Sequence, residues 1–209
     1  MNEIIACPSC QRKVTVPSEF FGKQVQCPQC KTTFLADSLG RQVFSPRVQI
    51  DERPLEPQGM ASSAFDEEGV ATRSRAVVRK GVVEGYFLGS YSARKLGMKS
   101  TGSAGGHHNL VVETGDLDFR GMLKEMGRGL LVTELLGQGV NLVTGDYSRG
   151  AAGYWVENGQ IAFPVEEITI AGNLKDMFRQ IAAIGSDVIV RSGRSCGSIL
   201  VENMTIAGE

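Results

Sequence analysis

The stretch GYWVENGQIAF, residues 153–163, indicates the fold more directly than any other part of the sequence. Apolar and polar residues alternate on both sides of Asn158-Gly159, the dipeptide preferred in the two-residue type I′ turns that join antiparallel strands. This stretch therefore predicts a β-hairpin. A second hairpin is predicted where residues 75–79 and 82–88 flank Lys80-Gly81.

Helices are predicted at three places outside these hairpins. Ser90 would cap a short helix that ends at Leu96, and Asp116 or Asp118 would cap a helix that ends at Met126. The third helix would be capped by Asn173, and its apolar positions are Leu174, Met177, Phe178, Ile181 and Ile184. Further strands are predicted at residues 47–51, 109–113, 130–136, 140–144, 167–170, 187–190 and 198–206. The expected fold class is α+β, a mainly antiparallel β-sheet domain with two or three helices.

The composition is that of a soluble globular protein. Of 209 residues, 42% are hydrophobic and 22% are charged, so the chain can hold one ordinary domain and a small module but not two large domains. A net charge of -1 gives no overall reason to bind nucleic acid or an anionic membrane. No apolar run approaches the roughly 20 residues needed to cross a bilayer, and the first residues do not form a leader peptide. We therefore expect a cytoplasmic protein.

Four of the five cysteines lie within the first 30 residues as two CxxC pairs, Cys7 with Cys10 and Cys27 with Cys30. This spacing is the four-thiolate zinc pattern, in which each pair forms a tight knuckle and all four sulfurs bind one ion. Two disulfides or a redox dithiol are the alternatives. A cytoplasmic location and the absence of a thioredoxin-like βαβ pattern disfavour both of them.

Residues 13–16 and 23–26 are predicted to form a hairpin between the two knuckles, with Pro17 and Gly22 at its turn. The stretch also resembles the short prokaryotic zinc ribbons at the N-termini of many otherwise unrelated proteins, which implies an interaction module with a structural zinc ion. We therefore expect a small zinc-ribbon module over residues 1–36 that precedes the α+β domain, residues 37–209. Within that domain, residues 37–64 are rich in Pro, Ser and Gln and are interpreted as a linker or edge segment.

The only two histidines, His107 and His108, follow a glycine-rich loop at residues 100–106. The loop lacks the GxxxxGK[ST] pattern of a phosphate loop. Neighbouring residues at the start of a strand point to opposite faces, so the two imidazoles are not expected to share a metal ion. The sequence also lacks HExxH, the usual helical motif of a zinc hydrolase.

Three other residues are candidates for a functional role. Cys196 lies near Arg191 and Arg194, which could lower the pKa of its thiol and make it a metal ligand or a nucleophile. The sequence favours the alternative of a buried or turn cysteine without chemistry. Asp146 and Arg149 lie in a predicted loop before the 153–163 hairpin, where a solvated polar role is the simpler interpretation.

Several stretches together resemble the TldD/PmbA family of peptidases and gyrase modulators, and most closely its PmbA (TldE) branch. They are FDEEGV at 65–70, SYSARKLG at 90–97, GQGV at 137–140, TGDYSRGAAG at 144–153, residues 168–176 and CGS at 196–198. The resemblance extends from about Asp37 to Glu209 and corresponds to the C-terminal part of the family's proteins. It implies a cytoplasmic peptidase system that degrades unfolded peptides and matures peptide antibiotics. In that system a TldD-type subunit with a zinc-binding HExxxH helix pairs with a PmbA-type subunit.

This sequence departs from the family pattern because it contains no HExxxH. Cys196 lies where the TldD-type subunit places a cysteine ligand, but the matching histidines are missing. The resemblance therefore implies an accessory component that acts in proteolysis or peptide maturation through a TldD-type partner, or that self-associates. The alternative is a zinc-ribbon adaptor or truncated relative that binds protein or nucleic acid without catalysis. Whether the chain is itself an enzyme is left open.

Overall fold

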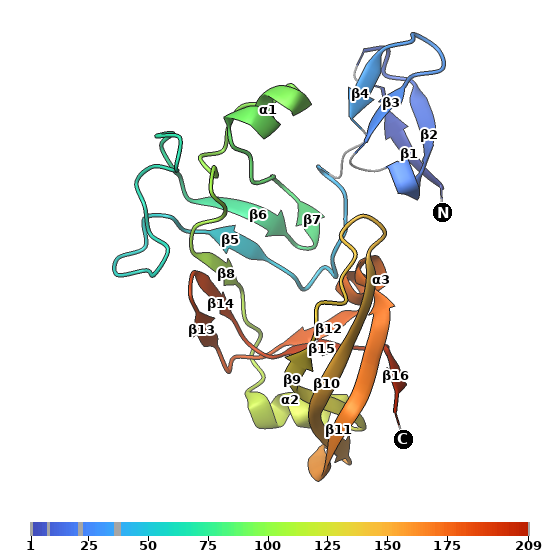
Figure 1. Cartoon of the computed structure of the whole chain (residues 1–209), viewed down its shortest axis with the longest axis vertical. Coiled ribbons are helices and arrows are strands. Elements are labelled where there is room, and N and C mark those ends of the chain that lie inside the picture. The colour runs from blue at the N-terminus through green and yellow to red at the C-terminus, as the bar shows by residue number, and fades with distance from the viewer. Residues whose placement is uncertain (1, 8, 21–22, 36–38, 209) are drawn as a thin grey trace.

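The fold is mainly antiparallel β-sheet, and the predicted fold class is confirmed. The structure is a computed structural model, and it describes residues 2–7, 9–20, 23–35 and 39–208. Within these ranges there are three α-helices, and a cluster of cysteines lies near the N-terminus (Figure 1). None of the helices in the described part of the chain is long and apolar enough to cross a membrane.

The 153–163 hairpin forms as predicted, and its turn joins the longest strand pair in the described chain. β10 (Asp146–Glu157) pairs with β11 (Gln160–Asn173), so both strands extend well beyond the predicted hairpin. Asn158 and Gly159 have φ angles of 52° and 71°, the left-handed values that a type I′ turn requires. Asp146 and Arg149 therefore belong to a strand, whereas the sequence predicted a loop at this position.

Three sheets form the larger part of the molecule. β10 and β11 lie in a four-stranded antiparallel sheet with β9 (Gly129–Leu136) and β16 (Thr205–Ala207), in the order β16-β11-β10-β9. A two-stranded sheet pairs β12 (Ile181–Ile184) with β15 (Ile199–Val201). The third sheet has six strands in the order β13-β14-β8-β5-β6-β7 (Figure 1).

The six-stranded sheet collects segments that are far apart in the sequence. Its strands are β5 (Ile50–Glu52), β6 (Arg75–Arg79), β7 (Val82–Val83), β8 (Leu110–Val112), β13 (Ile189–Arg191) and β14 (Arg194–Cys196). Only the β8–β14 pair is parallel among its described ladders. β5 comes from the segment interpreted as a linker or edge, and it lies between β6 and β8 in the interior of the sheet. The predicted 75–88 hairpin is present as β6 and β7, although its second strand is only two residues long.

The N-terminal ribbon consists of two separate hairpins. β1 (Asn2–Ala6) pairs with β2 (Lys13–Pro17), and β3 (Gln24–Gln26) pairs with β4 (Thr33–Leu35). The predicted pairing of residues 13–16 with 23–26 is therefore wrong. Each CxxC knuckle is the turn of its own hairpin, and a 3-10 helix over Ser18–Phe20 connects the two hairpins. Gly22 of the predicted turn lies outside the described residues.

The three α-helices occur where they were predicted, but their ends differ in two places. α2 (Phe119–Met126) is capped by Asp118, whose carboxylate accepts the Gly121 N–H at 2.7 Å. The N-cap residue of α1 (Ser90–Leu96) is Gly89, which has no side chain to cap the helix, and the N–H of Ser90 donates to Glu68 Oε2 at 2.7 Å instead. The predicted capping role of Ser90 is therefore wrong.

α3 (Leu174–Arg179) is capped by Asn173 as expected, but it is shorter than predicted. Ile181 and Ile184 continue its apolar spacing in the sequence, yet they lie in β12. Both are buried against the six-stranded sheet, so the prediction that they belong to the core holds although their secondary structure was wrong. The predicted strand at 140–144 is also absent. These residues form a turn, in which the Asn141 side chain accepts the N–H groups of Val143 and Thr144.

The glycine-rich loop at residues 100–106 donates one hydrogen bond to a buried carboxylate of the protein itself, that of Asp66. Asp66 is 5% exposed, and its side chain accepts the N–H groups of Glu68, Val70 and Ala104, each at 2.9 Å. Burial alone would raise the pKa of Asp66, but these three hydrogen bonds outweigh burial and lower the pKa. The ionised carboxylate therefore holds the 65–70 turn against the glycine-rich loop.

Replacing Asp66 with Asn should lower the melting temperature at pH 7 by roughly 2–8 °C, because the amide offers one accepting oxygen where the carboxylate offers two. A lowered native pKa stabilises the fold above the unfolded value, taken as 3.8, and this stabilisation disappears as the pH falls through the native pKa. The gap between the wild type and Asp66→Asn should therefore close below pH 3.8. Urea unfolding from pH 7 to pH 3 measures it, with exposed Asp116→Asn as the control. A gap that does not change with pH would contradict the role of the ionised carboxylate.

Candidate metal centre

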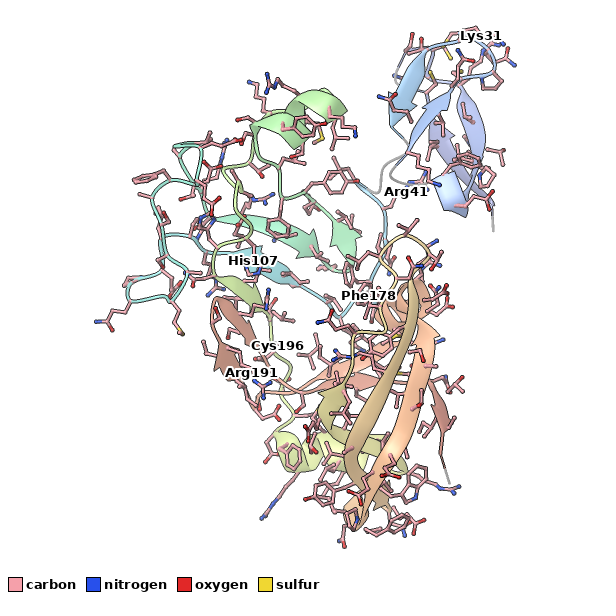
Figure 2. The ribbon with its side chains drawn as sticks, viewed as in Figure 1. Lys31, Arg41, His107, Phe178, Arg191 and Cys196 are labelled. Atoms are coloured by element: carbon pink, nitrogen blue, oxygen red, sulfur yellow. The ribbon has the colours of Figure 1, made fainter. Side chains whose placement is uncertain are left out.

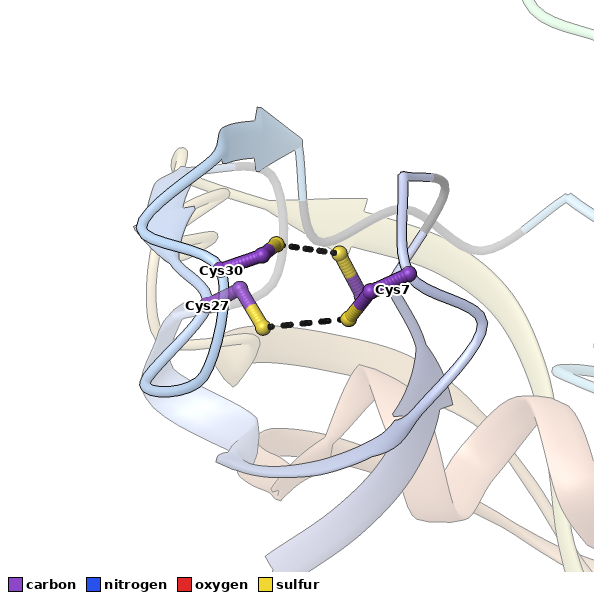
Figure 3. A group of neighbouring side chains, drawn as sticks. Cys7, Cys27 and Cys30 are labelled. Carbon is purple, nitrogen blue, oxygen red and sulfur yellow. Dashed lines mark hydrogen bonds between the residues drawn. The ribbon is translucent and has the colours of Figure 1, made fainter.

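The four N-terminal cysteines come together at one point, where the turns of the two ribbon hairpins meet. One sulfur from each cysteine lies within 4.8 Å of the other three, and no other cluster of metal-ligating residues is found in the described chain. Cys7 Sγ lies 3.6 Å from Cys30 Sγ, and Cys10 Sγ lies 3.8 Å from Cys27 Sγ (Figure 3). The two knuckles therefore face each other across a small gap.

The knuckles have the same backbone structure, repeated at an interval of 20 residues. The N–H of Cys7 donates to Arg12 O, and the N–H of Gln11 donates to Cys7 O, both at 2.9 Å. In the second knuckle, Cys27 and Lys31 make the equivalent bonds at 2.9 and 3.0 Å. Gln11 and Lys31 both have left-handed backbones, with φ angles of 58° and 61°. Because the two knuckles have nearly the same structure, their two sulfur pairs are arranged symmetrically.

The sulfur distances fit a tetrahedral metal ion and exclude disulfides. Four sulfurs about 2.3 Å from a central zinc ion lie about 3.8 Å from one another. The observed pairs at 3.6 and 3.8 Å are close to this value and far beyond the ~2.05 Å of a disulfide bond. All five cysteines are free thiols in the described chain. The geometry of the donor set is therefore that of a metal centre.

Hydrogen bonds favour the thiolate form of two of the four cysteines by lowering the pKa of their thiols. The hydroxyl and N–H of Thr32 lower the pKa of Cys30 to about 6, and the N–H groups of Cys30 and Gln29 lower the pKa of Cys27. Cys10 differs: a hydrogen bond from the Arg12 backbone lowers its pKa, but burial and the adjacent sulfurs raise it to about 11. Four thiolates this close together repel one another, and a divalent cation between them removes that repulsion.

Cys196 lies on β14, and the charge that acts on its thiol is negative, whereas its neighbours in the sequence are positively charged. Burial first, and then the negative charge of Asp187, raise the pKa of its thiol. Arg194 instead donates from Nε to His107 Nε2 at 3.1 Å (Figure 2). Arg191 lies opposite Arg194 beside the turn of the hairpin, whereas Cys196 lies opposite Ile189. The two arginines therefore do not lower the pKa of Cys196, and a functional role for this cysteine stays a prediction. The Cys196 thiol donates to Gly197 O at 3.2 Å.

The two adjacent histidines contact different groups. His107 is bonded to Arg194, whereas the N–H and Nδ1 of His108 contact Glu52 Oε1 at 2.9 and 3.3 Å. Glu52 is 2% exposed, and its Oε2 also accepts Arg75 Nε at 2.8 Å. The sequence did not indicate this buried network, because Glu52 lies between two other charged residues, Asp51 and Arg53, in a segment interpreted as a linker or edge.

Asp146 and Arg149 do not combine into one site. They are three residues apart on β10, so their side chains point to opposite faces of the sheet. Asp146 accepts the Thr144 hydroxyl at 2.6 Å and the Asn173 amide at 3.2 Å, and Arg149 donates to Gly137 O. Both side chains therefore hold the 137–145 turn in place, and a further role for them stays a prediction.

Comparison with known proteins identifies the family. A family model described as the PmbA/TldA metallopeptidase C-terminal domain matches residues 19–208. The chain belongs to this family. It is 57% identical over 179 residues to the metalloprotease PmbA of Escherichia coli O157:H7 and 52% identical over 181 residues to the PmbA homologue of Haemophilus influenzae. These matches cover 86% and 85% of the chain but 40% of each relative, so the chain spans about two-fifths of their length.

Solved structures of the family support the same assignment. A protein from Thermotoga maritima is 42% identical to the chain and has a TM-score of 0.75, and the match covers 81% of this chain and 41% of that one. TldE from Thermococcus kodakarensis is 26% identical, has a TM-score of 0.74, and is matched over 83% of this chain and 42% of its own. The predicted family resemblance is therefore confirmed.

The purified chain should contain about one zinc ion, because the thiolate set is complete and zinc prefers four sulfurs. Replacing both Cys7 and Cys10 with serine should remove it, whereas the larger part of the chain, which has its own apolar core, should stay folded. Elemental analysis and circular dichroism measure these two results, with Cys196→Ser as the control that keeps the metal. A second zinc ion lost on changing Cys196, His107 or His108 would contradict a single centre.

The thiol of Cys196 should react slowly with iodoacetamide at pH 8, because its pKa is raised. Replacing Asp187 with Asn should speed alkylation at this pH by roughly two- to threefold, since it removes the charge that opposes the thiolate but leaves the burial. Mass spectrometry of the zinc-loaded protein follows the rate, with exposed Asp116→Asn as the control. Equal rates in the wild type and Asp187→Asn would contradict this influence of the carboxylate.

Proposed function

We propose that the chain is an accessory component of a PmbA/TldD-type metallopeptidase system and carries a structural zinc ribbon. The observation that supports this most is the composition of the metal centre. All four donors are cysteine sulfurs from the protein, so a tetrahedral ion there has no open position for water or substrate. A catalytic zinc ion needs such a position.

No second donor set in the sequence supplies the missing site. The chain has two histidines, they are adjacent, and no HExxxH pattern occurs. His107 and His108 are engaged with Arg194 and Glu52, respectively. The thiol of Cys196 has a raised pKa, which disfavours the thiolate that a metal ligand must be. These features support a chain that depends on a TldD-type subunit for peptide hydrolysis.

The ribbon is proposed as residues 1–36 and the family domain as residues 37–209. In the described residues, the ribbon strands pair only with one another. Its buried cluster is small and contains two of the cysteines themselves, Cys7 and Cys27. Fewer than ~40 residues rarely fold on an apolar core alone, so the zinc ion would supply much of the folding free energy. Reduced thiolates of this kind also suit the cytoplasm.

The accessory role can be tested with unfolded peptides as substrates. The purified zinc-loaded chain should cleave none of them alone, and it should support chelator-sensitive cleavage when mixed with a TldD-type subunit. The matched control is the same mixture with both histidines of the partner's HExxxH motif changed to alanine, which should be inactive. Chelator-sensitive cleavage by the chain alone would overturn the proposal. Binding to other proteins without any effect on cleavage would favour the adaptor alternative.

A further inference from the structure

β13 is a free edge of the six-stranded sheet and has an unusually apolar surface. Among the described strands, the sheet order places β14 on one side of β13 and none on the other (Figure 1). Val188, Ile189 and Val190 are 45%, 58% and 61% exposed, although β-branched apolar residues are normally buried. An exposed apolar edge is the kind of strand that pairs with another chain.

The backbone of β13 has N–H and C=O groups that point away from β14, at Val190. A two-residue turn, Ser192-Gly193, joins β13 to β14, so Arg191 and Arg194 close the hairpin as a hydrogen-bonded pair. In the alternating antiparallel pattern, the next residue along, Val190, directs its N–H and C=O away from β14. Outside the strand ladders, the described residues provide no backbone hydrogen bond to Val190.

The sequence around β13 is complementary to itself. The segment Asp187-Val188-Ile189-Val190-Arg191 has three apolar residues between an acidic residue at one end and a basic residue at the other. Antiparallel pairing with a copy of itself, centred on Ile189, would place each Val188 opposite a Val190 and each Asp187 opposite an Arg191. Opposite charges facing each other across a strand pair are stabilising, and like charges are destabilising. A two-fold dimer requires this kind of self-complementary surface.

Within the described residues of one chain, the arginine side chains of the hairpin are not paired with acidic groups. Arg191 lies directly opposite Arg194, a like-charge pair on one face of the hairpin. Arg194 is bonded to His107, but the Arg191 side chain has no ion-pair partner in the described chain. Asp187, two residues before β13, accepts the N–H and hydroxyl of Ser198 at 3.0 and 2.6 Å. A second copy would bring an acidic group next to each Arg191.

We propose that β13 pairs antiparallel with β13 of a second copy of this chain, with Ile189 at the two-fold axis. Val190 N–H of each copy donates to Val188 C=O of the other, and the two six-stranded sheets join into one. This interface does not include the ribbon, and its test measures self-association of the chain in the absence of a TldD-type subunit. A negative result for either proposal leaves the other unaffected.

A neighbouring loop extends the apolar surface beyond the strand. Gly193 in the hairpin turn lies so close to Ala61 that an added Cβ would be 2.5 Å from the Ala61 Cβ. The loop that contains Ala61 also carries Leu55 and Met60, which are 59% and 74% exposed. A strand of three residues with this loop is a small interface beside the ~1,200 Å² of stable complexes, so we expect association that depends on protein concentration.

A cysteine at the proposed axis tests the register directly. Residue 189 of one copy faces residue 189 of the other in a non-hydrogen-bonded pair, where the Cα atoms are about 4.5 Å apart and a disulfide can form. In a Cys196→Ala background with zinc bound, Ile189→Cys should give disulfide-linked dimers under mild oxidation. Val190→Cys, which is equally exposed but faces residue 188, is the matched control and should give roughly tenfold less.

Two further variants test the chemistry of the pairing without a cross-link. Val190→Pro removes the N–H that donates to the second copy but no bond within the hairpin, and edge strands tolerate proline. Arg191→Glu places two acidic groups opposite each other at both ends of the pair. Sedimentation equilibrium should show a wild-type dimer that either variant weakens by about tenfold or more, whereas Arg120→Glu on the exposed face of α2 should not. A wild-type monomer at all concentrations, or equal cross-linking at 189 and 190, would overturn the proposal.

Discussion

The six-stranded sheet is held together at its centre by one buried carboxylate. Glu52 lies on β5, almost completely hidden from solvent, and binds the guanidinium of Arg75 on β6 and the backbone and imidazole of His108 before β8. A charge in this position is tolerable only with all its partners in place, because an unpaired buried charge costs about 3–5 kcal/mol. The contacts of Glu52 therefore tie together three neighbouring strands of the sheet, β6, β5 and β8. Asn109, one residue further on, ties the 53–62 loop to the same point through its side chain.

The sequence indicated the local features of this fold much better than its long-range ones. The Asn158-Gly159 turn, the caps at Asp118 and Asn173 and the CxxC knuckles all depend on interactions within a few residues, and local sequence records such interactions. The pairing of the ribbon strands was mispredicted, because spacing does not reveal whether a knuckle lies between hairpins or forms the turn of one. Ile181 and Ile184 show the same limit. Their helical spacing is real, but tertiary contacts with the sheet place them in a strand.

The candidate site shows the same division between what is local and what is not. Cysteine spacing was sufficient to find four sulfurs that meet at one point, because a metal centre demands that pattern. The neighbours of Cys196 in the sequence left two interpretations of its surroundings open. Arginines at positions 191 and 194 are close along the chain, but the hairpin directs one towards His107 and leaves Asp187 as the charge that acts on the thiol. The electrostatics of a side chain follow its neighbours in space.

The order of strands in the six-stranded sheet determines when each part of the protein can fold during synthesis. The strand pairs of the ribbon are complete once β4 has emerged, and its hairpins need no later segment for their strand pairing. The sheet has the opposite property: β8 pairs with β14, which lies more than 80 residues further along the chain. At about 5–20 residues per second, the ribosome would expose β5, β6 and β8 for roughly 4–17 seconds before that pairing is available. A nascent chain would therefore carry a folded ribbon that can bind its metal ion and a sheet that is still incomplete. Chaperones would meet the chain in this state.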